Sequence, residues 1–144
     1  MNGCRSCASL ATMEPLSGVP YVYVGEHFVV DHAVPIARPG WFVIVTRRHV
    51  AALHDLTGDE WRELGTLLPS VVTALHDATG SEKEYVLQLA EAPGFQHVHW
   101  HVVAVQPGDD LRGVDIFQLL KPTEPRSAGD LMPLCDDVRE RLAN

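Results

Sequence analysis

The feature that most constrains this chain is a run in which histidines alternate with large apolar residues, His97-Val98-His99-Trp100-His101-Val102-Val103. Successive side chains of a β-strand point to opposite faces, so this order predicts a strand with its imidazoles on one face and apolar side chains on the other. A half-buried sheet buries its apolar face. The histidine face is therefore predicted to line a prepared site rather than the core.

Three other segments are also predicted to form strands. Residues 21–30 are rich in β-branched and aromatic residues and are interrupted by Gly25-Glu26, which indicates a hairpin of two strands. Residues 41–45 and 85–89 are short runs of similar composition. Together with the histidine strand, they favour an antiparallel sheet.

A long helix is predicted between residues 57 and 79. Thr57-Gly58-Asp59-Glu60 has the spacing of a capping box, in which the Thr and Glu side chains satisfy free backbone N–H groups of the first turn. Apolar residues then recur at intervals of three and four until Gly80, which makes one apolar stripe. Pro69 lies within the stripe and is expected to kink the helix rather than end it, because the pattern resumes in phase.

The order of these elements indicates one α+β domain built on an antiparallel sheet. Residues 1–20 hold several turn formers and no apolar periodicity, and they are predicted to form a loop-rich arm. Residues 21–106 make up the domain itself. Residues 107–144 are rich in Pro and Gly, and they are predicted to form a loop-rich tail packed on the same domain and closed by a short helix near 134–142.

Length and charge exclude several classes of function. The 144 residues suit one domain, and the net charge of −8 argues against a protein that grips long nucleic acid, because such binding needs many Lys and Arg. No uncharged run approaches the ~20 residues that cross a bilayer, so no membrane partner is expected. The three cysteines do not form an even disulfide framework, which favours a reducing, cytoplasmic location.

Two kinds of chemistry suit the histidine strand. Alternate strand histidines can bind Zn²⁺, and a catalytic zinc typically has three protein ligands. Alternatively, one neutral imidazole can attack a phosphorus atom while its neighbours fix its tautomer and deliver a proton. The residues alone leave both readings open, together with that of a solvent-facing strand that carries histidines without a function.

The run at 97–103 resembles the histidine triad (HIT) family, whose hallmark is His-φ-His-φ-His-φ-φ with φ apolar, and it matches this pattern at every position. The resemblance covers residues 20–105 and includes a strand that ends in Arg47-Arg48-His49 and the helix start at Leu56 to Glu60. It implies a HIT-like fold for the predicted antiparallel sheet and the long helix. The resemblance does not extend to residues 106–144, where the short C-terminal helix is predicted.

The resemblance also implies a function: hydrolysis or transfer of a nucleotide from a phosphate anhydride or a phosphoramidate, with a nucleotide-type small molecule as substrate and no organic cofactor. His99 is expected to attack the α-phosphorus and form a nucleotidyl-histidine, which water then cleaves. His101 is expected to contact the phosphate and the leaving group. His97 is expected to hold the nucleophile strand and its hydrogen bonds.

Three further residues are candidates for substrate binding. Asp31 stands where the family often has an Asp or Asn that bonds the ribose hydroxyls, although an Asp there also stabilises a turn. Gln88 and Gln96 are the amides available for phosphate contacts, and each is also an ordinary surface residue.

The chain departs from the family pattern at two places. Many members have a fourth histidine at the position of Trp41, so a relay partner of His97 is expected to be missing. The Pro-Arg that often follows the triad is replaced by Ala104-Val105. These departures leave an alternative from another class, a non-catalytic nucleotide- or zinc-binding module with the same fold.

Relatives with a Cys-x-x-Cys pair near the N-terminus bind a structural Zn²⁺. By residue match, the resemblance implies the ligands Cys4, Cys7, His49 and His97. Four nitrogen and sulfur ligands make a closed tetrahedral site, which is structural rather than catalytic. The alternative is a pair of reduced surface cysteines on a mobile arm.

HIT proteins commonly pair as two-fold dimers, so a homodimer is also expected. Its interface would use the apolar stripe of the 57–79 helix and the strand at 85–89, unless packing against the chain's own sheet consumes that stripe.

Overall fold

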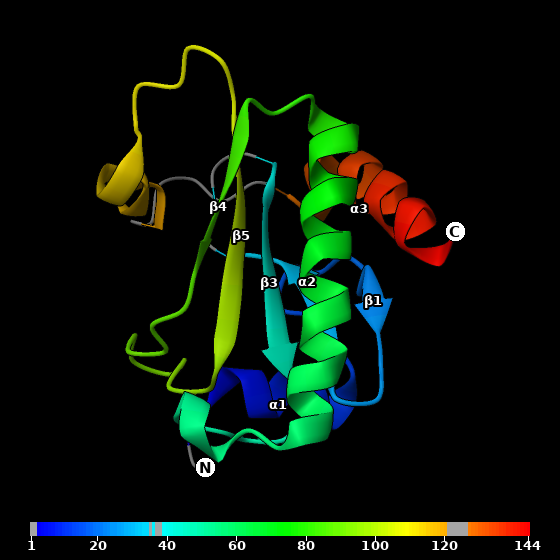
Figure 1. The fold of residues 1–144 in the computed structure, drawn as a ribbon, viewed down its shortest axis with the longest axis vertical. Helices are drawn as coiled ribbons and strands as arrows, with labels where there is room; N and C mark the ends of the chain where they lie inside the picture. Colours follow the sequence, from blue (N-terminus) through cyan, green and yellow to red (C-terminus); the bar gives the residue numbers. More distant parts are fainter. Residues whose placement is uncertain (1–2, 35, 37–38, 121–126) are drawn as a thin grey trace.

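The computed structural model describes residues 3–34, 36, 39–120 and 127–144, which form helices packed on a five-stranded antiparallel sheet (Figure 1). Residues 121–126 of the expected tail lie outside this described part. The α+β class predicted from the sequence is confirmed.

The histidine strand lies inside the sheet rather than at its edge. The spatial order of the strands is β1, β2, β3, β5, β4. Their bounds are β1 (Tyr23–Val24), β2 (Phe28–His32), β3 (Trp41–Thr46), β4 (Lys83–Leu87) and β5 (His99–Val105). Because β5 is hydrogen-bonded to β3 on one side and β4 on the other, the positions of its side chains are fixed from both sides.

Two long helices cover one face of the sheet, α2 (Gly58–Thr79) and α3 (Ala128–Ala143) (Figure 1). The predicted capping box of α2 is present: the Glu60 backbone N–H donates to Thr57 Oγ1 at 3.2 Å, and the Thr57 N–H donates to the Glu60 carboxylate at 2.7 Å. The helix continues through Pro69 and ends at Gly80, whose left-handed φ of 67° suits glycine.

The main core lies between these helices and the sheet. Alternate residues of β5 enter it, because Trp100, Val102 and Ala104 point toward α2 and α3. Further core side chains come from the other strands and from both helices: Phe28, Val30, Phe42, Ile44, Leu64, Leu67, Val71, Leu75, Leu131, Cys135 and Val138. His99 and His101 are left for the opposite face, as the sequence predicts.

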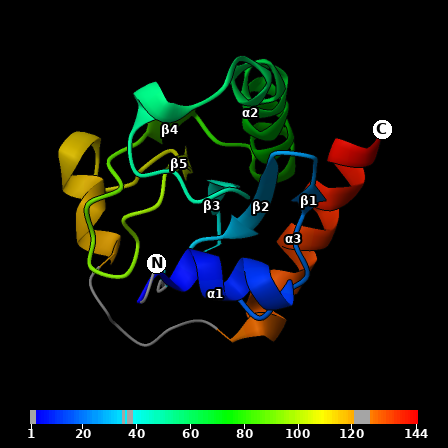
Figure 2. The same ribbon diagram turned by 90° about the horizontal axis from the view of Figure 1, so that it is seen from below.

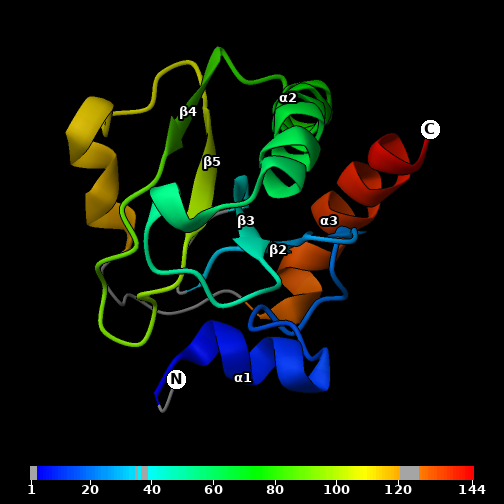
Figure 3. The same ribbon diagram turned by 60° about the horizontal axis from the view of Figure 1, so that its bottom comes forward.

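The opposite face carries smaller elements. The helix α1 (Arg5–Thr12) lies on the side of the sheet away from α2 (Figure 2), at the end near the loop that precedes β5 (Figure 3). The 3₁₀-helix η2 (Gly113–Leu120) contributes Ile116 to a second, smaller apolar cluster with Trp41 and Val103. A short 3₁₀-helix, η1 (Leu53–Asp55), precedes α2.

Both ends of the chain are more regular than the sequence predicts. Within the expected loop-rich arm, residues 5–12 form α1, whose N-cap is Cys4. In the expected tail, the C-terminal helix begins at Ala128, well before the expected start near 134. Ser127 and Asp130 form a capping box there. Pro133 lies inside the helix, whereas the Pro- and Gly-rich sequence predicts a loop at that position.

Candidate active site and metal centre

A cavity of about 540 Å³ opens on the face of the sheet that carries the histidines. His99 and His101 lie in its wall, together with residues of α1, β2, β3 and the loop between β4 and β5. Most of the lining is apolar, and among the described lining residues Arg5 is the one Lys or Arg side chain. A largely apolar cavity with a few convergent polar groups is the usual form of a small-molecule site.

The sheet register places the two histidines side by side in this wall. On β3, Val45 pairs with His99 and Val43 pairs with His101, so these small apolar side chains flank the imidazoles. The side chains of residues two apart on a strand share one face. The two rings meet edge to face, with centroids 4.8 Å apart.

Hydrogen bonds assign the protons of His99. Its Nδ1 lies 2.6 Å from the carbonyl oxygen of His97, and because a carbonyl only accepts, Nδ1 carries the proton. The lone pair of neutral His99 is therefore on Nε2, which lies 3.1 Å from Nε2 of His101. This is the atom through which an imidazole in the cavity wall can attack a bound substrate.

Burial keeps both imidazoles neutral at pH 7. Desolvation lowers the pKa of His99 below its ordinary value, and its hydrogen bond to the His97 carbonyl opposes this effect only in part. Desolvation, followed by repulsion from His99, lowers the pKa of His101 to about 3. A neutral imidazole is the nucleophilic form, so the site is suited to nucleophilic attack without prior deprotonation.

His97 differs from the other two histidines of the run. It precedes β5, is fully buried and is not among the residues that line the cavity. The prediction that all three imidazoles share one strand face is therefore wrong for His97, because the strand begins only at His99. Its ring reaches instead toward the N-terminal cysteines.

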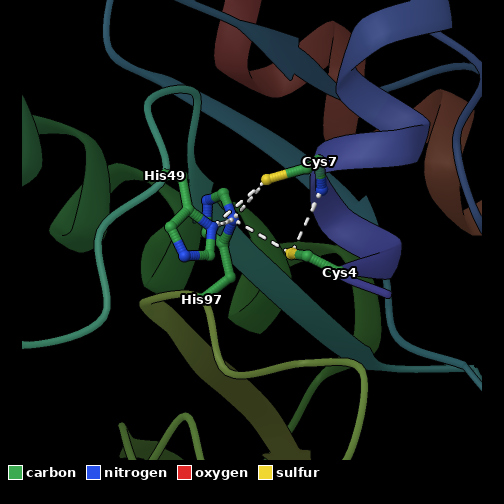
Figure 4. A group of neighbouring side chains, drawn as sticks. All are labelled: Cys4, Cys7, His49 and His97. Carbon is green, nitrogen blue, oxygen red and sulfur yellow. Dashed lines mark hydrogen bonds between the residues drawn. The ribbon is translucent and has the colours of Figure 1, made fainter. Parts of the chain in front are cut away.

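Cys4, Cys7, His49 and His97 converge on one point (Figure 4). Their sulfur and nitrogen atoms all lie within 4.8 Å of one another. Nδ1 of His97 lies 3.3 Å from Nδ1 of His49, 3.5 Å from Sγ of Cys7 and 3.6 Å from Sγ of Cys4. Cys7 Sγ lies 3.2 Å from His49 Nδ1.

These separations fit a tetrahedral metal ion. Zn²⁺ bonds nitrogen at about 2.0–2.1 Å and sulfur at about 2.3 Å, which separates two nitrogen ligands by roughly 3.4 Å and a nitrogen from a sulfur by roughly 3.6 Å. The distances around His97 Nδ1 agree closely with these values. The resemblance to zinc-binding relatives and the geometry of the side chains therefore point to the same four ligands.

Local structure explains how the two cysteines reach this point. Cys4 caps α1, and its Sγ accepts a hydrogen bond from the Cys7 backbone N–H at 3.4 Å, so both thiols lie at the first turn of the helix. The Arg5 N–H donates to the Gly94 carbonyl at 2.8 Å, which ties this turn to the loop before β5. No apolar stripe marks this helix in the sequence, because only Ser6 and Ser9 of α1 are buried.

The predicted substrate-binding residues lie in different places. Asp31 lines the cavity and is 5% exposed, and its carboxylate accepts hydrogen bonds from the Ser17 hydroxyl, the Ser17 N–H and the His32 N–H. Burial raises the pKa of Asp31, and these bonds oppose the rise. Gln88 is half-buried and Gln96 is exposed, and neither is among the residues that line the cavity.

Trp41 lies beside His101 and not beside His97, which is the neighbour that the family pattern implies for this position. Its indole N–H donates to Nδ1 of His101 at 2.8 Å, so position 41 adjoins His101 rather than His97. The register explains the contact: Trp41 pairs with Val103 and lies diagonally across from His101 on the same face. Only the family pattern, which often has a histidine at this position, marked it as functional.

No protein-family model and no curated protein matches the chain. Of the helices in the described part of the chain, none has the length and apolar character that a bilayer crossing requires.

Several solved structures, in contrast, are similar over nearly the whole chain. A hypothetical histidine triad nucleotide-binding protein of Sulfolobus tokodaii is 19% identical, with a TM-score of 0.75 over 98% of this chain and 93% of that one. A zinc-bound histidine triad family protein of Mycobacterium smegmatis is 18% identical, with a TM-score of 0.69 over 97% and 93%. A HIT-like protein of Bartonella henselae involved in cell-cycle regulation is 18% identical, with a TM-score of 0.70 over 93% and 92%. These structures share the α+β fold of this chain, in which the strand that carries the alternating histidines lies inside the sheet. The chain has the fold of the histidine triad proteins.

Proposed function

We propose that this protein is a nucleotide hydrolase or transferase that cleaves a nucleoside phosphate anhydride or phosphoramidate through a nucleotidyl-histidine. The observation that carries the proposal is the state of His99: its Nδ1–H is held by the His97 carbonyl at 2.6 Å, which leaves the Nε2 lone pair at the cavity. The similarity to a histidine triad nucleotide-binding protein supports a nucleotide as the ligand.

In the proposed reaction, Nε2 of His99 attacks the α-phosphorus and displaces the leaving group. His101 lies beside it and contacts the phosphate and the leaving group. Water then attacks the phosphorus, and the electron pair of the P–N bond returns to Nε2. Two successive displacements replace one difficult step, and the fixed orientation of His99 lowers the cost of reaching the attack geometry.

The cavity offers further contacts for the substrate. Asp31 is placed to accept hydrogen bonds from ribose hydroxyls, and Arg5 supplies positive charge for a phosphate. His97 holds the strand and its hydrogen bonds from outside the cavity. Gln88 and Gln96, in contrast, do not line the cavity, so the case for their contact with a phosphate is weaker.

We also propose that Cys4, Cys7, His49 and His97 hold a structural Zn²⁺. The zinc-bound histidine triad protein of Mycobacterium smegmatis supports a metal in this fold. The ion joins α1 to the end of β3 and to the start of the histidine run, and it supplies rigidity rather than a reactive group, because four protein ligands close its coordination.

Two further features complete the proposal, a cytoplasmic location and a homodimer. None of the cysteines in the described chain forms a disulfide, which suits the reducing cytoplasm. β4 lies at the edge of the sheet, and this edge together with the half-exposed side chains of Trp61 and Val86 offers material for a homodimer. Light scattering that detects only the monomer at micromolar concentration would argue against that dimer.

The alternative is a nucleotide- or zinc-binding module without turnover. Mass spectrometry distinguishes the two. The protein is incubated with dinucleoside polyphosphates, nucleoside phosphoramidates and adenylated acids, and quenched samples are examined for products and for a nucleotide on His99. The His99→Ala variant is the matched control. Products together with a trapped adduct on His99 support the enzyme. Binding of nucleotide with neither products nor an adduct supports the non-catalytic binding module.

A further inference from the structure

The hydrogen bond between Trp41 and His101 determines which nitrogen of His101 carries the proton. An indole N–H only donates, so Nδ1 of His101 must accept at the 2.8 Å contact and cannot carry a proton there. Neutral His101 then has its proton on Nε2. That N–H points along the 3.1 Å contact to Nε2 of His99.

The far end of the same chain of hydrogen bonds gives an independent check. The His97 carbonyl only accepts, which places the His99 proton on Nδ1 and makes His99 Nε2 an acceptor. The Trp41 indole and the His97 carbonyl therefore imply the same hydrogen bond between the two rings, in which Nε2–H of His101 donates to Nε2 of His99. The direction is thus Trp41 to His101 to His99 to the carbonyl, with every donor matched to an acceptor.

Trp41 is held firmly enough to enforce this arrangement. It is 1% exposed and packs in the apolar cluster with Ile36, Val103 and Ile116. Its ring stands edge-on to His101, with centroids 5.7 Å apart at an interplanar angle of 84°. Protonation of His101 at Nδ1 would set two N–H groups against each other in a buried place, which is costly.

We infer that Trp41 is a positioning residue that holds His101 as a neutral hydrogen-bond donor, and that the site therefore acts on nucleotides whose leaving group departs as an anion, such as a carboxylate or a phosphate. This inference rests on the proposed function and selects one of its two substrate classes. An amine leaving group must gain a proton before or as it departs, and a neutral imidazole is a poor source of that proton.

The chemical steps balance without proton transfer from His101. His99 Nε2 forms a bond to phosphorus as the P–O bond to the leaving group breaks, and the leaving group keeps the electron pair and departs as an anion. The Nε2–H of His101 turns from His99 to hydrogen-bond the departing oxygen and retains its proton. In the second step water forms a P–O bond, the P–N electron pair returns to His99, and one proton from water is released to solvent.

Other charged or titratable groups do not compensate for Trp41. Besides His99, those that line the same cavity are Arg5 of α1, Asp31 and His32 of β2, and Tyr21. Among the interactions of the described residues, no hydrogen bond or ion pair joins any of these four to His101. The state of His101 therefore depends on Trp41, His99 and the depth of burial.

The first test reads the state of His101 in the resting protein. Nitrogen-15 NMR of the histidine side chains is expected to show a pyridine-like Nδ1 and a pyrrole-like Nε2 for His101 at pH 6.5. In Trp41→Phe, which keeps an aromatic ring but loses the donor, the midpoint of His101 protonation is expected to rise by about one pH unit or more. A protonated Nδ1 in the wild type would overturn the inference, and so would an unchanged midpoint in the variant.

The second test measures kcat/KM on a matched pair, an adenylated carboxylic acid and an adenosine phosphoramidate of similar size. General acid catalysis is worth roughly 100- to 10,000-fold, so the wild type is expected to favour the anhydride by at least about 100-fold. Trp41→His, which can accept as well as donate at Nδ1 of His101, is expected to reduce this ratio at least about tenfold. Trp61→Phe, on the far side of the sheet, is the control and should leave the ratio unchanged.

The outcomes separate the two proposals. Equal turnover of both substrates by the wild type, or a ratio that Trp41→His and Trp41→Phe leave unaltered, overturns the role of Trp41 while the enzyme proposal stands. No turnover of either substrate overturns the proposed function and the substrate preference with it. Preferential cleavage of the anhydride, lost in part in Trp41→His, supports both.

Discussion

The carbonyl oxygen of Thr46 accepts a hydrogen bond from Nε2 of His97 at 2.7 Å, and this single contact decides which nitrogen of His97 faces the cysteines. With its proton on Nε2, His97 presents the lone pair of Nδ1 to the thiols of Cys4 and Cys7. Metal-binding histidines typically donate their other N–H to a carbonyl or carboxylate in this way. Thr46 at the end of β3 thus orients His97, a proposed metal ligand that lies far from it in the sequence.

Zinc is expected to purify with the protein at close to one ion per chain. Cys4→Ser combined with Cys7→Ser should lose the ion and lower the thermal midpoint, because the free energy of metal binding contributes to folding. Elemental analysis of protein purified without chelator or metal-affinity resin is the measurement. Cys135→Ala, which removes a thiol buried in the main core, is the control and should keep the ion. Fewer than about 0.2 zinc ions per wild-type chain would refute the site.

His99→Ala is expected to lower kcat/KM by roughly a thousandfold or more, because the covalent route closes without the nucleophile. His101→Ala should have a smaller effect on substrates with anionic leaving groups, since its N–H assists but transfers no proton. Steady-state kinetics on an adenylated acid measures both. Near wild-type activity in His99→Ala would show that the nucleophile is another residue.

Arg5→Gln is expected to raise KM for nucleotide substrates by about tenfold and to change kcat little, because an exposed cation at a cavity rim binds phosphate in both ground and transition states. The guanidinium lies 5.0 Å from the centre of the Phe95 ring, which holds it at the rim. The effect should weaken as salt is added. Arg62→Gln, on the exposed surface of α2, is the control. An unchanged KM at low salt would contradict this role.

The free energy of unfolding is expected to fall in acid through Glu60. The Glu60 side chain is 3% exposed, and its hydrogen bonds to Arg48, above all, lower its pKa to about 2. A carboxylate with a depressed pKa contributes stability above its unfolded pKa near 4.5 and loses that contribution as pH falls toward 2. Chemical denaturation of Glu60→Gln should show a loss of about 1–2 kcal/mol at pH 7 and a shallower decline between about pH 5 and pH 2. Glu91→Gln, on the surface, should follow the wild type.

Local patterns predicted the parts of the fold that local chemistry determines. The alternation at 97–103 located the central strand, and the Thr57–Glu60 spacing located the start of α2, because period and capping are properties of neighbouring residues. α1 has neither signal. Its position depends on the Cys4–Cys7 pair and on contacts with the 94–97 segment, which are distant in sequence.

The partner of Trp41 was predicted wrongly for a related reason. Which histidine it meets depends on the register of β3 against β5, and sixty residues separate Trp41 from His101 along the chain. A shift of two residues would have placed the indole elsewhere along the strand. The sequence marks His97, His99 and His101 as one group. Their separation into one ring that faces Cys4 and Cys7 and two rings that face the cavity follows from where β5 begins.

The small number of buried residues in α1 has a consequence for the dynamics of the chain. Because only Ser6 and Ser9 of this helix are buried, little apolar contact opposes its detachment from the sheet. We expect the backbone amides of residues 8–12 to exchange with deuterium as one cooperative unit, slowly while the metal is bound and faster by at least about tenfold after chelation, with the amides of β5 nearly unaffected. Mass-resolved exchange measures this directly, and uniform acceleration across α1 and β5 would contradict it. If α1 detaches in this way, one wall of the cavity opens and closes independently of the sheet that carries His99.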